Sequence, residues 1–207
     1  MLVLASASPR RRALLAAAGM AFAVEPADVD ETLAGAPAPE EAARELARRK
    51  ALAALARHRG ETAWIVAADT VVGLPPARPG EGWRLLGKPL DEAEARAMLA
   101  SLSGTRHRVV TGVCVARCRD GALAEGAETT LVAMRPLAPE EVRDYAASGE
   151  WRDKAGGYAI QESADRFVTA LEGGGFDNVV GLPVALTLDL IARLGGPGPV
   201  AGGAGPG

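Results

Sequence analysis

The sequence contains little cysteine and histidine, the residues on which zinc and thiol sites are most often built. Its 207 residues include two cysteines, Cys114 and Cys118, and two histidines. The cysteines are spaced along one predicted strand, and no second cysteine pair completes a zinc site. This usage excludes a disulfide framework and indicates a reduced, cytoplasmic protein.

Long apolar runs and a strong charge of one sign are also missing. No segment approaches the roughly 18 apolar residues of a membrane span, and the apolar start at residues 1–5 is too short for a signal peptide. The formal net charge is −3, which argues against a nucleic-acid coat or a membrane-surface binder. No Walker-type or Rossmann-type glycine motif follows a predicted strand. A phosphate site would therefore have to be a local basic patch.

The N-terminal stretch supplies such a patch. Residues 2–5 predict a short buried strand, Ser8 is a suitable helix N-cap, and Pro9 suits the first helical position. The first turn then carries three consecutive cations, Arg10, Arg11 and Arg12. Positive charge at a helix N-terminus costs a few tenths of a kcal/mol or more per residue, and a bound anion would offset this cost. The alternative is that the arginines are solvated and the cost is tolerated.

The most apolar strand-like segment spans residues 63–74 and predicts the central strand, with Asp69 inside it. A carboxylate in these surroundings is costly to bury unless it is paired or binds a cation. No helical pattern follows at once, which argues against a capping role. Asp69 is therefore the best candidate for a metal ligand or a general base, and a buried ion pair is the structural alternative.

Further charged candidates lie on either side of this strand. Asp30 and Glu31 follow a short predicted strand. They are either loop carboxylates or residues that help to bind a metal. Residues 39–58 predict a long amphipathic helix, in which Lys50 lies at the rim of the apolar stripe. The pattern alone favours a snorkelling lysine, with a ligand-facing lysine as the alternative. Lys88 follows the second arm of a predicted hairpin and is another candidate cation.

The remaining segments complete an alternation of helices and strands. Helices are predicted at residues 91–102, 139–147 and 183–194, and strands at 106–118, 128–135, 158–161 and 166–171. His107 lies in one of these strands, where a structural role is more common than a catalytic one. No repeat or linker divides residues 1–194, and residues 195–207 are so rich in glycine and proline that we expect a disordered tail.

Six motifs occur in order along the chain. They are LASASPRR at 4–11, LARRKA at 46–51, AADT at 67–70, GKP at 87–89, DKAGGYAIQ at 153–161 and NVVGLPV at 178–184. Together they resemble the Maf family of nucleotide pyrophosphatases over essentially the whole chain except the tail. The resemblance implies a mixed α/β fold related to inosine-triphosphatase-like folds, in which a long sheet is split by a cleft between two lobes. It also implies hydrolysis of nucleoside triphosphates to monophosphate and pyrophosphate with Mg²⁺ or Mn²⁺.

The resemblance assigns roles residue by residue. Asp69 resembles the proton acceptor or metal-binding carboxylate. The residues that match those holding the triphosphate are Ser6, Arg11, Lys50 and Lys88. The residues that match positions associated with base choice are Arg10, Thr70 and Gln161. Three cations with a divalent metal suit the charge that grows on the departing pyrophosphate, and a carboxylate suits the attacking water.

The motifs are most similar to the branch of the family that acts on dTTP and UTP, whereas a 7-methyl-GTP branch would be expected to replace Thr70 and Gln161. Glu162 departs from the pattern, in which glycine follows the glutamine. The alternatives are a pyrophosphatase for 7-methyl-GTP or ITP-like nucleotides and a non-catalytic nucleotide-binding regulator of cell division. A buried Asp69 favours turnover over binding alone. A homodimer is compatible with all of these interpretations.

Overall fold

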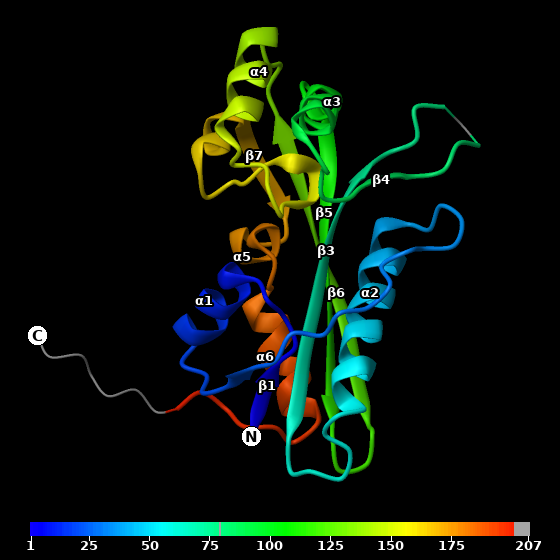
Figure 1. Cartoon of the computed structure of the whole chain (residues 1–207), viewed down its shortest axis with the longest axis vertical. Coiled ribbons are helices and arrows are strands. Elements are labelled where there is room, and N and C mark those ends of the chain that lie inside the picture. The colour runs from blue at the N-terminus through cyan, green and yellow to red at the C-terminus, as the bar shows by residue number, and fades with distance from the viewer. Residues whose placement is uncertain (79, 201–207) are drawn as a thin grey trace, which may run out of the picture.

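The computed structural model describes residues 1–78 and 80–200, and its centre is a seven-stranded mixed sheet (Figure 1). The strands are β1 (Leu2–Leu4), β2 (Ala23–Val24), β3 (Trp64–Leu74), β4 (Arg84–Leu86), β5 (Arg106–Arg117), β6 (Leu123–Met134) and β7 (Val168–Gly173). The helices are α1 (Pro9–Ala17), α2 (Pro39–Leu55), α3 (Glu92–Leu102), α4 (Pro139–Ser148), α5 (Phe176–Val180) and α6 (Val184–Arg193), with 3-10 turns η1 (Ala155–Gly157) and η2 (Ser163–Phe167). The predicted mixed α/β class is confirmed.

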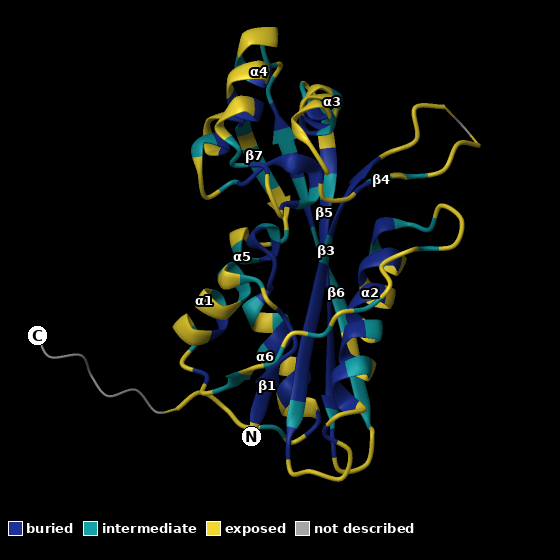
Figure 2. Ribbon diagram, in the orientation of Figure 1, coloured by how far each residue is buried: buried dark blue, intermediate teal, exposed yellow. Residues whose placement is uncertain are grey.

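Three long strands, β3, β5 and β6, run through the molecule and connect its two ends (Figure 1). At one end they are accompanied by α1, α2 and α6, and at the other end by α3 and α4. Each end has its own apolar cluster. The strands β3 and β5 are buried for most of their length, whereas most of β6 is only partly buried (Figure 2). Among the described residues, no helix is long and apolar enough to cross a membrane.

One edge of β3 is shared by two short strands, and this creates an opening in the sheet. The parallel strand β1 pairs with residues 64–66, and the antiparallel strand β4 pairs with residues 72–74. The other edge of β3 pairs continuously with β5. Within the described chain, residues 67–71 therefore have no strand partner on the first edge. Asp69 and Thr70 lie in this interval.

The pleat of β3 directs neighbouring side chains to opposite faces of the sheet. Ile65 and Ala67 pack in the cluster that includes α2, whereas Val66 and Ala68 pack in the cluster that includes α1 and α6. By the same alternation, Asp69 faces α2 and Thr70 faces α1. The side chains of two consecutive residues thus lie on opposite faces of the sheet.

Small residues let α2 approach the sheet closely at this level. Gly112 on β5 lies opposite Asp69, and a Cβ atom there would be 2.2 Å from the carbonyl oxygen of Ala43 on α2. The sheet-facing side of α2 is mostly alanine, which Ala47 and Ala54 illustrate, and both are fully buried. Most side chains between α2 and the strand that carries Asp69 are therefore small, although Leu46 of α2 packs in one cluster with Val71 of β3.

Two local predictions differ from the structure. Residues 158–161 form an irregular turn rather than a strand, because Tyr158 is buried through its contact with His107 and not through pairing in the sheet. The short helix α5 was not expected from the sequence. Of the tail, residues 201–207 lie outside the described part of the chain. Residues 195–200 carry neither helix nor strand, and the Val200 N–H donates to the Gly19 carbonyl at 2.9 Å.

Candidate active site

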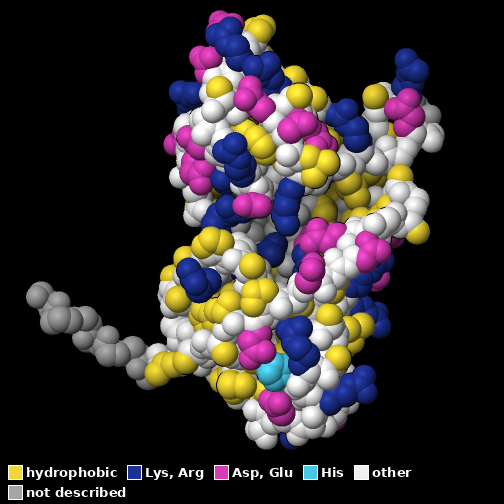
Figure 3. Space-filling view, viewed as in Figure 1, with side chains coloured by type: hydrophobic (Ala, Val, Ile, Leu, Met, Phe, Trp, Pro, Cys, Tyr) yellow, Lys and Arg dark blue, Asp and Glu magenta, His cyan; other side chains and the backbone are white. Residues whose placement is uncertain are grey.

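A cleft of about 720 Å³ opens at the interval in the β3 edge. Acidic and basic side chains lie next to each other where the molecule is hollowed between its two ends (Figure 3). The cleft brings together all of the site residues predicted from the sequence: Ser6, Arg10, Arg11, Glu31, Lys50, Asp69, Thr70, Lys88 and Gln161.

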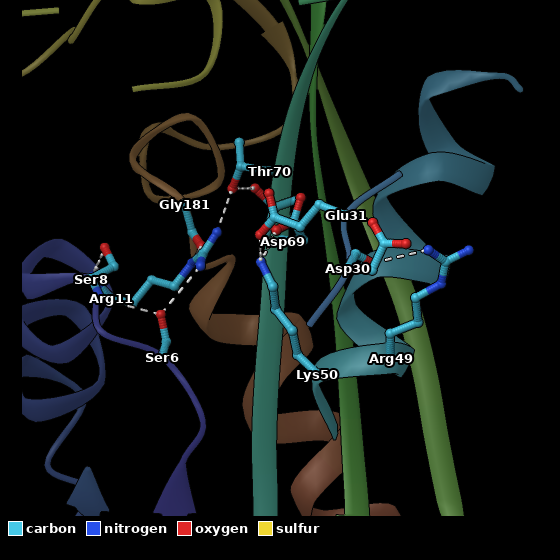
Figure 4. Close-up of polar contacts among 11 residues, drawn as sticks. Ser6, Ser8, Arg11, Asp30, Glu31, Arg49, Lys50, Asp69, Thr70 and Gly181 are labelled. Carbon is cyan, nitrogen blue, oxygen red and sulfur yellow. Dashed lines mark hydrogen bonds and ion pairs between the residues drawn. The ribbon is translucent and has the colours of Figure 1, made fainter. Parts of the chain in front are cut away.

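On the α1 side of β3, the guanidinium of Arg11 contacts uncharged oxygen atoms (Figure 4). Its Nε donates to the Gly181 carbonyl at 2.8 Å, and its two terminal nitrogens donate to Ser6 Oγ at 3.2 Å and Thr70 Oγ1 at 3.1 Å. Ser8 caps α1 by accepting from the Arg11 backbone N–H at 3.4 Å, as predicted. Burial lowers the pKa of Arg11. A desolvated cation with neutral partners at a helix N-terminus is suited to bind an anion.

On the α2 side, Lys50 is buried and its ammonium contacts two carboxylates (Figure 4). It donates to Asp69 Oδ1 and lies 2.6 Å from Glu31 Oε1. The prediction of a snorkelling lysine is therefore wrong. The alanine face of α2 lies directly on the sheet, so the lysine stem is covered and its head reaches Asp69 rather than solvent. The structural alternative for Asp69, a buried ion pair, is present in the structure.

The second carboxylate, Glu31, comes from the loop that precedes α2. Arg49 on α2 donates to the carbonyl oxygens on either side of it, to Asp30 at 3.0 Å and to Thr32 at 2.8 Å. Burial tends to raise the pKa of Glu31, but the hydrogen bond and charge of Lys50, with Lys88 and Arg11 beyond, hold it below its usual value. The neighbouring Asp30 accepts from the Thr32 N–H at 2.8 Å and is a loop carboxylate.

Lys88 and Gln161 are exposed residues of the cleft wall. Lys88 follows β4, and Gln161 lies in the turn between η1 and η2. Within residues 1–78 and 80–200, neither side chain makes a hydrogen bond or an ion pair, so both are available to a ligand. Arg10 connects α1 to the same turn region, because its guanidinium donates to the Asp153 carbonyl at 3.4 Å.

Lys154 was not predicted as a site residue and appears in the sequence analysis only within the motif DKAGGYAIQ. Lys154 is buried in the cleft wall and contacts the Glu150 carbonyl and Glu162 Oε2, the latter at 3.2 Å. The carboxylate of Glu162 is thus paired rather than free beside Gln161. The lysine within the DKAGGYAIQ motif was the signal that could have identified this pair.

His107 lies outside the cleft and supports the wall from behind. Its Nε2 is 2.8 Å from the hydroxyl oxygen of Tyr158, the two rings meet edge to face, and its side chain is fully buried. Burial lowers the pKa of His107 to about 4, so it is neutral at pH 7. The structural interpretation of this histidine agrees with its position.

Two carboxylates in the cleft are candidate ligands for a divalent metal. Asp69 and Glu31 converge on a single ammonium group, so a cation position between two carboxylates already exists. In the described residues, no group of three or more His, Cys, Asp or Glu side chains could hold a metal ion. Mg²⁺ commonly uses one or two carboxylates and takes its other ligands from phosphates and water. The residues therefore fit a metal that arrives with a phosphorylated substrate.

Cations that face a carboxylate pair across one strand are suited to bind a phosphorylated ligand. The sequence also matches known proteins. Residues 1–194 match the family described as Maf-like protein, and the chain belongs to this family. A relative from Myxococcus xanthus is 47% identical over 199 residues, covering 96% of this chain and 95% of its own length. One from Geobacter sulfurreducens is 46% identical over 195 residues, covering 94% and 96%. Both relatives are named dTTP/UTP pyrophosphatase.

Proposed function

We propose that this protein hydrolyses dTTP and UTP to the nucleoside monophosphate and pyrophosphate. The observation that carries the proposal is the placement of two cations on opposite faces of β3 in the cleft. Arg11 contacts two hydroxyls and a carbonyl, whereas Lys50 contacts the carboxylates of Asp69 and Glu31. The names of relatives that match over nearly their whole length support the choice of nucleotide.

Binding of the triphosphate is assigned to the α1 side of β3 and to Lys88 in the cleft wall. The backbone N–H groups at the start of α1, the fork of Arg11 and the hydroxyl of Ser6 together form a cradle for phosphate oxygens. Lys88 supplies a further positive charge from the opposite wall. These groups neutralise the charge that develops on the departing pyrophosphate, and they are positioned before the substrate arrives.

Water activation is assigned to Asp69. The water oxygen forms a bond to the α-phosphorus, the bond from that phosphorus to the α–β bridging oxygen breaks, and pyrophosphate leaves. The proton that the water loses passes to a carboxylate oxygen of Asp69. Lys50 keeps this carboxylate oriented, because its ammonium is anchored by Glu31 at the same time.

We also propose that the reaction requires Mg²⁺ or Mn²⁺, with Asp69 and Glu31 as the protein ligands. When bound, the ion would neutralise phosphate charge and polarise the scissile linkage. Base choice is assigned to Arg10, Thr70 and Gln161, since the amide of Gln161 can pair with both an acceptor and a donor of a pyrimidine edge. A cytoplasmic location agrees with two free, buried cysteines in the described chain.

The direct test is an assay of the purified chain with dTTP and UTP, in which pyrophosphate and monophosphate are both identified. We expect equal amounts of the two products with Mg²⁺ or Mn²⁺ present and none after chelation. The Asp69→Asn variant from the same expression host controls for a contaminating phosphatase. Release of orthophosphate with a diphosphate product would overturn the cleavage position. Faster turnover of 7-methyl-GTP or ITP would overturn the base assignment alone.

A further inference from the structure

A chain of buried hydroxyl groups leads from the cleft into the sheet. Thr70 Oγ1 on β3 lies 2.9 Å from Thr111 Oγ1 on β5, and Thr111 Oγ1 donates to the Asn178 carbonyl on α5 at 2.8 Å. Thr111 is fully buried, whereas Thr70 is partly exposed and lines the cleft. The two threonines are paired residues of the β3–β5 ladder.

The direction of each hydrogen bond in this chain follows from its ends. A carbonyl oxygen can only accept a hydrogen bond, so Thr111 donates its single hydroxyl proton to the Asn178 carbonyl. Thr70 must then donate its own proton to Thr111. The guanidinium of Arg11 has no acceptor, so its bond to Thr70 Oγ1 also uses a lone pair of Thr70. Thr70 therefore presents only its remaining lone pair to the cleft.

Ser6, on the other side of Arg11, has the opposite polarity. Its Oγ accepts from Arg11 at 3.2 Å and from the Ser8 backbone N–H at 3.3 Å. Both lone pairs are engaged, so the Ser6 hydroxyl proton remains to be donated into the cleft. A phosphate oxygen can accept that proton. The lone pair of Thr70 cannot serve a phosphate oxygen and requires a donor on the ligand.

We propose that Thr111 is a positioning residue for substrate specificity, because it fixes Thr70 as a hydrogen-bond acceptor that selects a nucleobase carrying an imide N–H. Uracil and thymine carry this donor at N3, whereas cytosine carries an acceptor at the same atom. UTP and CTP have nearly the same shape, so the polarity of Thr70 separates them by hydrogen bonding rather than by size. The inference rests on the proposed function, in which Thr70 contacts the base.

The test compares UTP with CTP in Thr111→Val, which keeps the side-chain shape and removes the hydroxyl. Without Thr111 Oγ1, the Thr70 proton is free to turn into the cleft and to meet N3 of cytosine. We expect the wild type to favour UTP by at least ~100-fold in kcat/KM, since a site built to pair a donor rejects the analogue that lacks it. In Thr111→Val this ratio should fall at least ~10-fold, a loss on the scale of one hydrogen bond. Thr111→Ser retains a hydroxyl and should restore the ratio.

Thr130→Val is the matched control. Thr130 is a fully buried threonine on β6 that accepts from Asn178 Nδ2 at 2.8 Å, so its loss disturbs α5 without reaching Thr70. We expect Thr130→Val and Thr111→Val to lower the melting temperature by similar amounts and only Thr111→Val to change the UTP/CTP ratio. If Thr111→Val cannot be obtained folded, Thr111→Ala replaces it with the same expected direction.

The outcomes separate the inference from the proposed function. An unchanged ratio in Thr111→Val, or an equal fall in Thr130→Val, would overturn the inference and leave the hydrolase assignment intact. Equal hydrolysis of UTP and CTP by the wild type would also overturn it. Failure of the wild type to release pyrophosphate from UTP would instead overturn the proposed function itself.

Discussion

The two sides of β3 carry cations in different electrostatic states. On the α1 side, Arg11 donates to two hydroxyls and a carbonyl, and within residues 1–78 and 80–200 no carboxylate forms an ion pair with it. On the α2 side, Lys50 lies between Asp69 and Glu31 and its charge is more than balanced. The α1 side is therefore suited to bind an anion, and the α2 side is suited to bind water or a further cation.

This difference follows from one strand and its neighbours. Asp69 and Thr70 are consecutive, so the pleat places a carboxylate on one face and a hydroxyl on the other. The helix on each face then supplies a cation at the same level. A triphosphate with a metal needs both kinds of surroundings within a few ångströms, and a single strand with a helix on each side provides them.

Breaking the α2 side should have the largest effect. Asp69→Asn keeps the shape but removes the charge, and activity should fall by at least ~10²-fold, as for a positioned acid–base group. Stability should fall by less than the ~3–5 kcal/mol of a fully stranded buried charge, because Glu31 remains on Lys50. Activity and melting temperature should be measured on one preparation. A folded and fully active variant would remove Asp69 from the chemistry.

Breaking the α1 side should weaken substrate binding. Arg11→Lys keeps one positive charge but loses the fork, and kcat/KM for dTTP should fall ~10- to 100-fold, as expected for charged hydrogen bonds worth ~1.5–3 kcal/mol. Arg11→Ala should also melt earlier, since the Gly181 carbonyl and Thr70 lose a donor.

The control for Arg11 is Arg12→Ala, which removes an exposed charge from the same helical turn. Its kcat/KM should stay within ~3-fold of wild type, because long-range attraction between exposed charges is screened by salt. Equal losses of kcat/KM in Arg11→Lys and Arg12→Ala would show that overall positive charge, and not the guanidinium fork of Arg11, favours substrate binding on the α1 side.

Arg49 holds the Glu31 loop against α2 and is not among the residues that line the cleft. Arg49→Met removes two hydrogen bonds to the backbone around Glu31, and kcat should fall ~3- to 10-fold. Arg48→Met is the control, since Arg48 is exposed and, among the described residues, pairs only with Glu125 at 3.6 Å. The Arg49→Met and Glu31→Gln losses should be less than additive if they act through one carboxylate. Additive losses would show that Arg49 does not act through the carboxylate of Glu31.

The smallest expected effect is a pH dependence of stability at His58, which contacts Glu25 at the start of the loop that carries Glu31. Hydrogen bonds to Glu61 and to Glu25 raise the pKa of His58. A raised folded-state pKa means that the stabilisation is fully present below the unfolded value of about 6.5 and is lost as pH rises through the folded value. The melting temperature of the wild type should therefore exceed that of His58→Gln most at pH 6 and least at pH 9. A difference that is constant across this range would exclude a charged His58.

Features that depend on neighbouring residues alone could be predicted from the sequence. Ser8 and Pro9 start α1 because capping and the fixed proline dihedral act within one turn. The apolar run around Asp69 marks β3, since a strand buried on both faces requires apolar residues throughout. The motifs also contain eight of the nine predicted site residues that line the cleft. Glu31 lies outside the motifs, and Lys154, which lies inside one, was not predicted as a site residue. None of these predictions needs a contact between distant segments.

The burial and the hydrogen-bond partners of the site side chains depend on contacts between distant segments and could not be predicted from the sequence. Lys50 is buried against Asp69 because Gly112 and the alanines of α2 let a helix and a sheet meet closely, and that depends on two surfaces at once. The turn at residues 158–161 resembles a strand in pattern, but Tyr158 is held by His107 from another strand. The polarity of Thr70 is fixed by Thr111, which is 41 residues away along the chain. Hydrogen-bond direction and burial are properties of packed neighbours, and packing is what the linear order of residues leaves open.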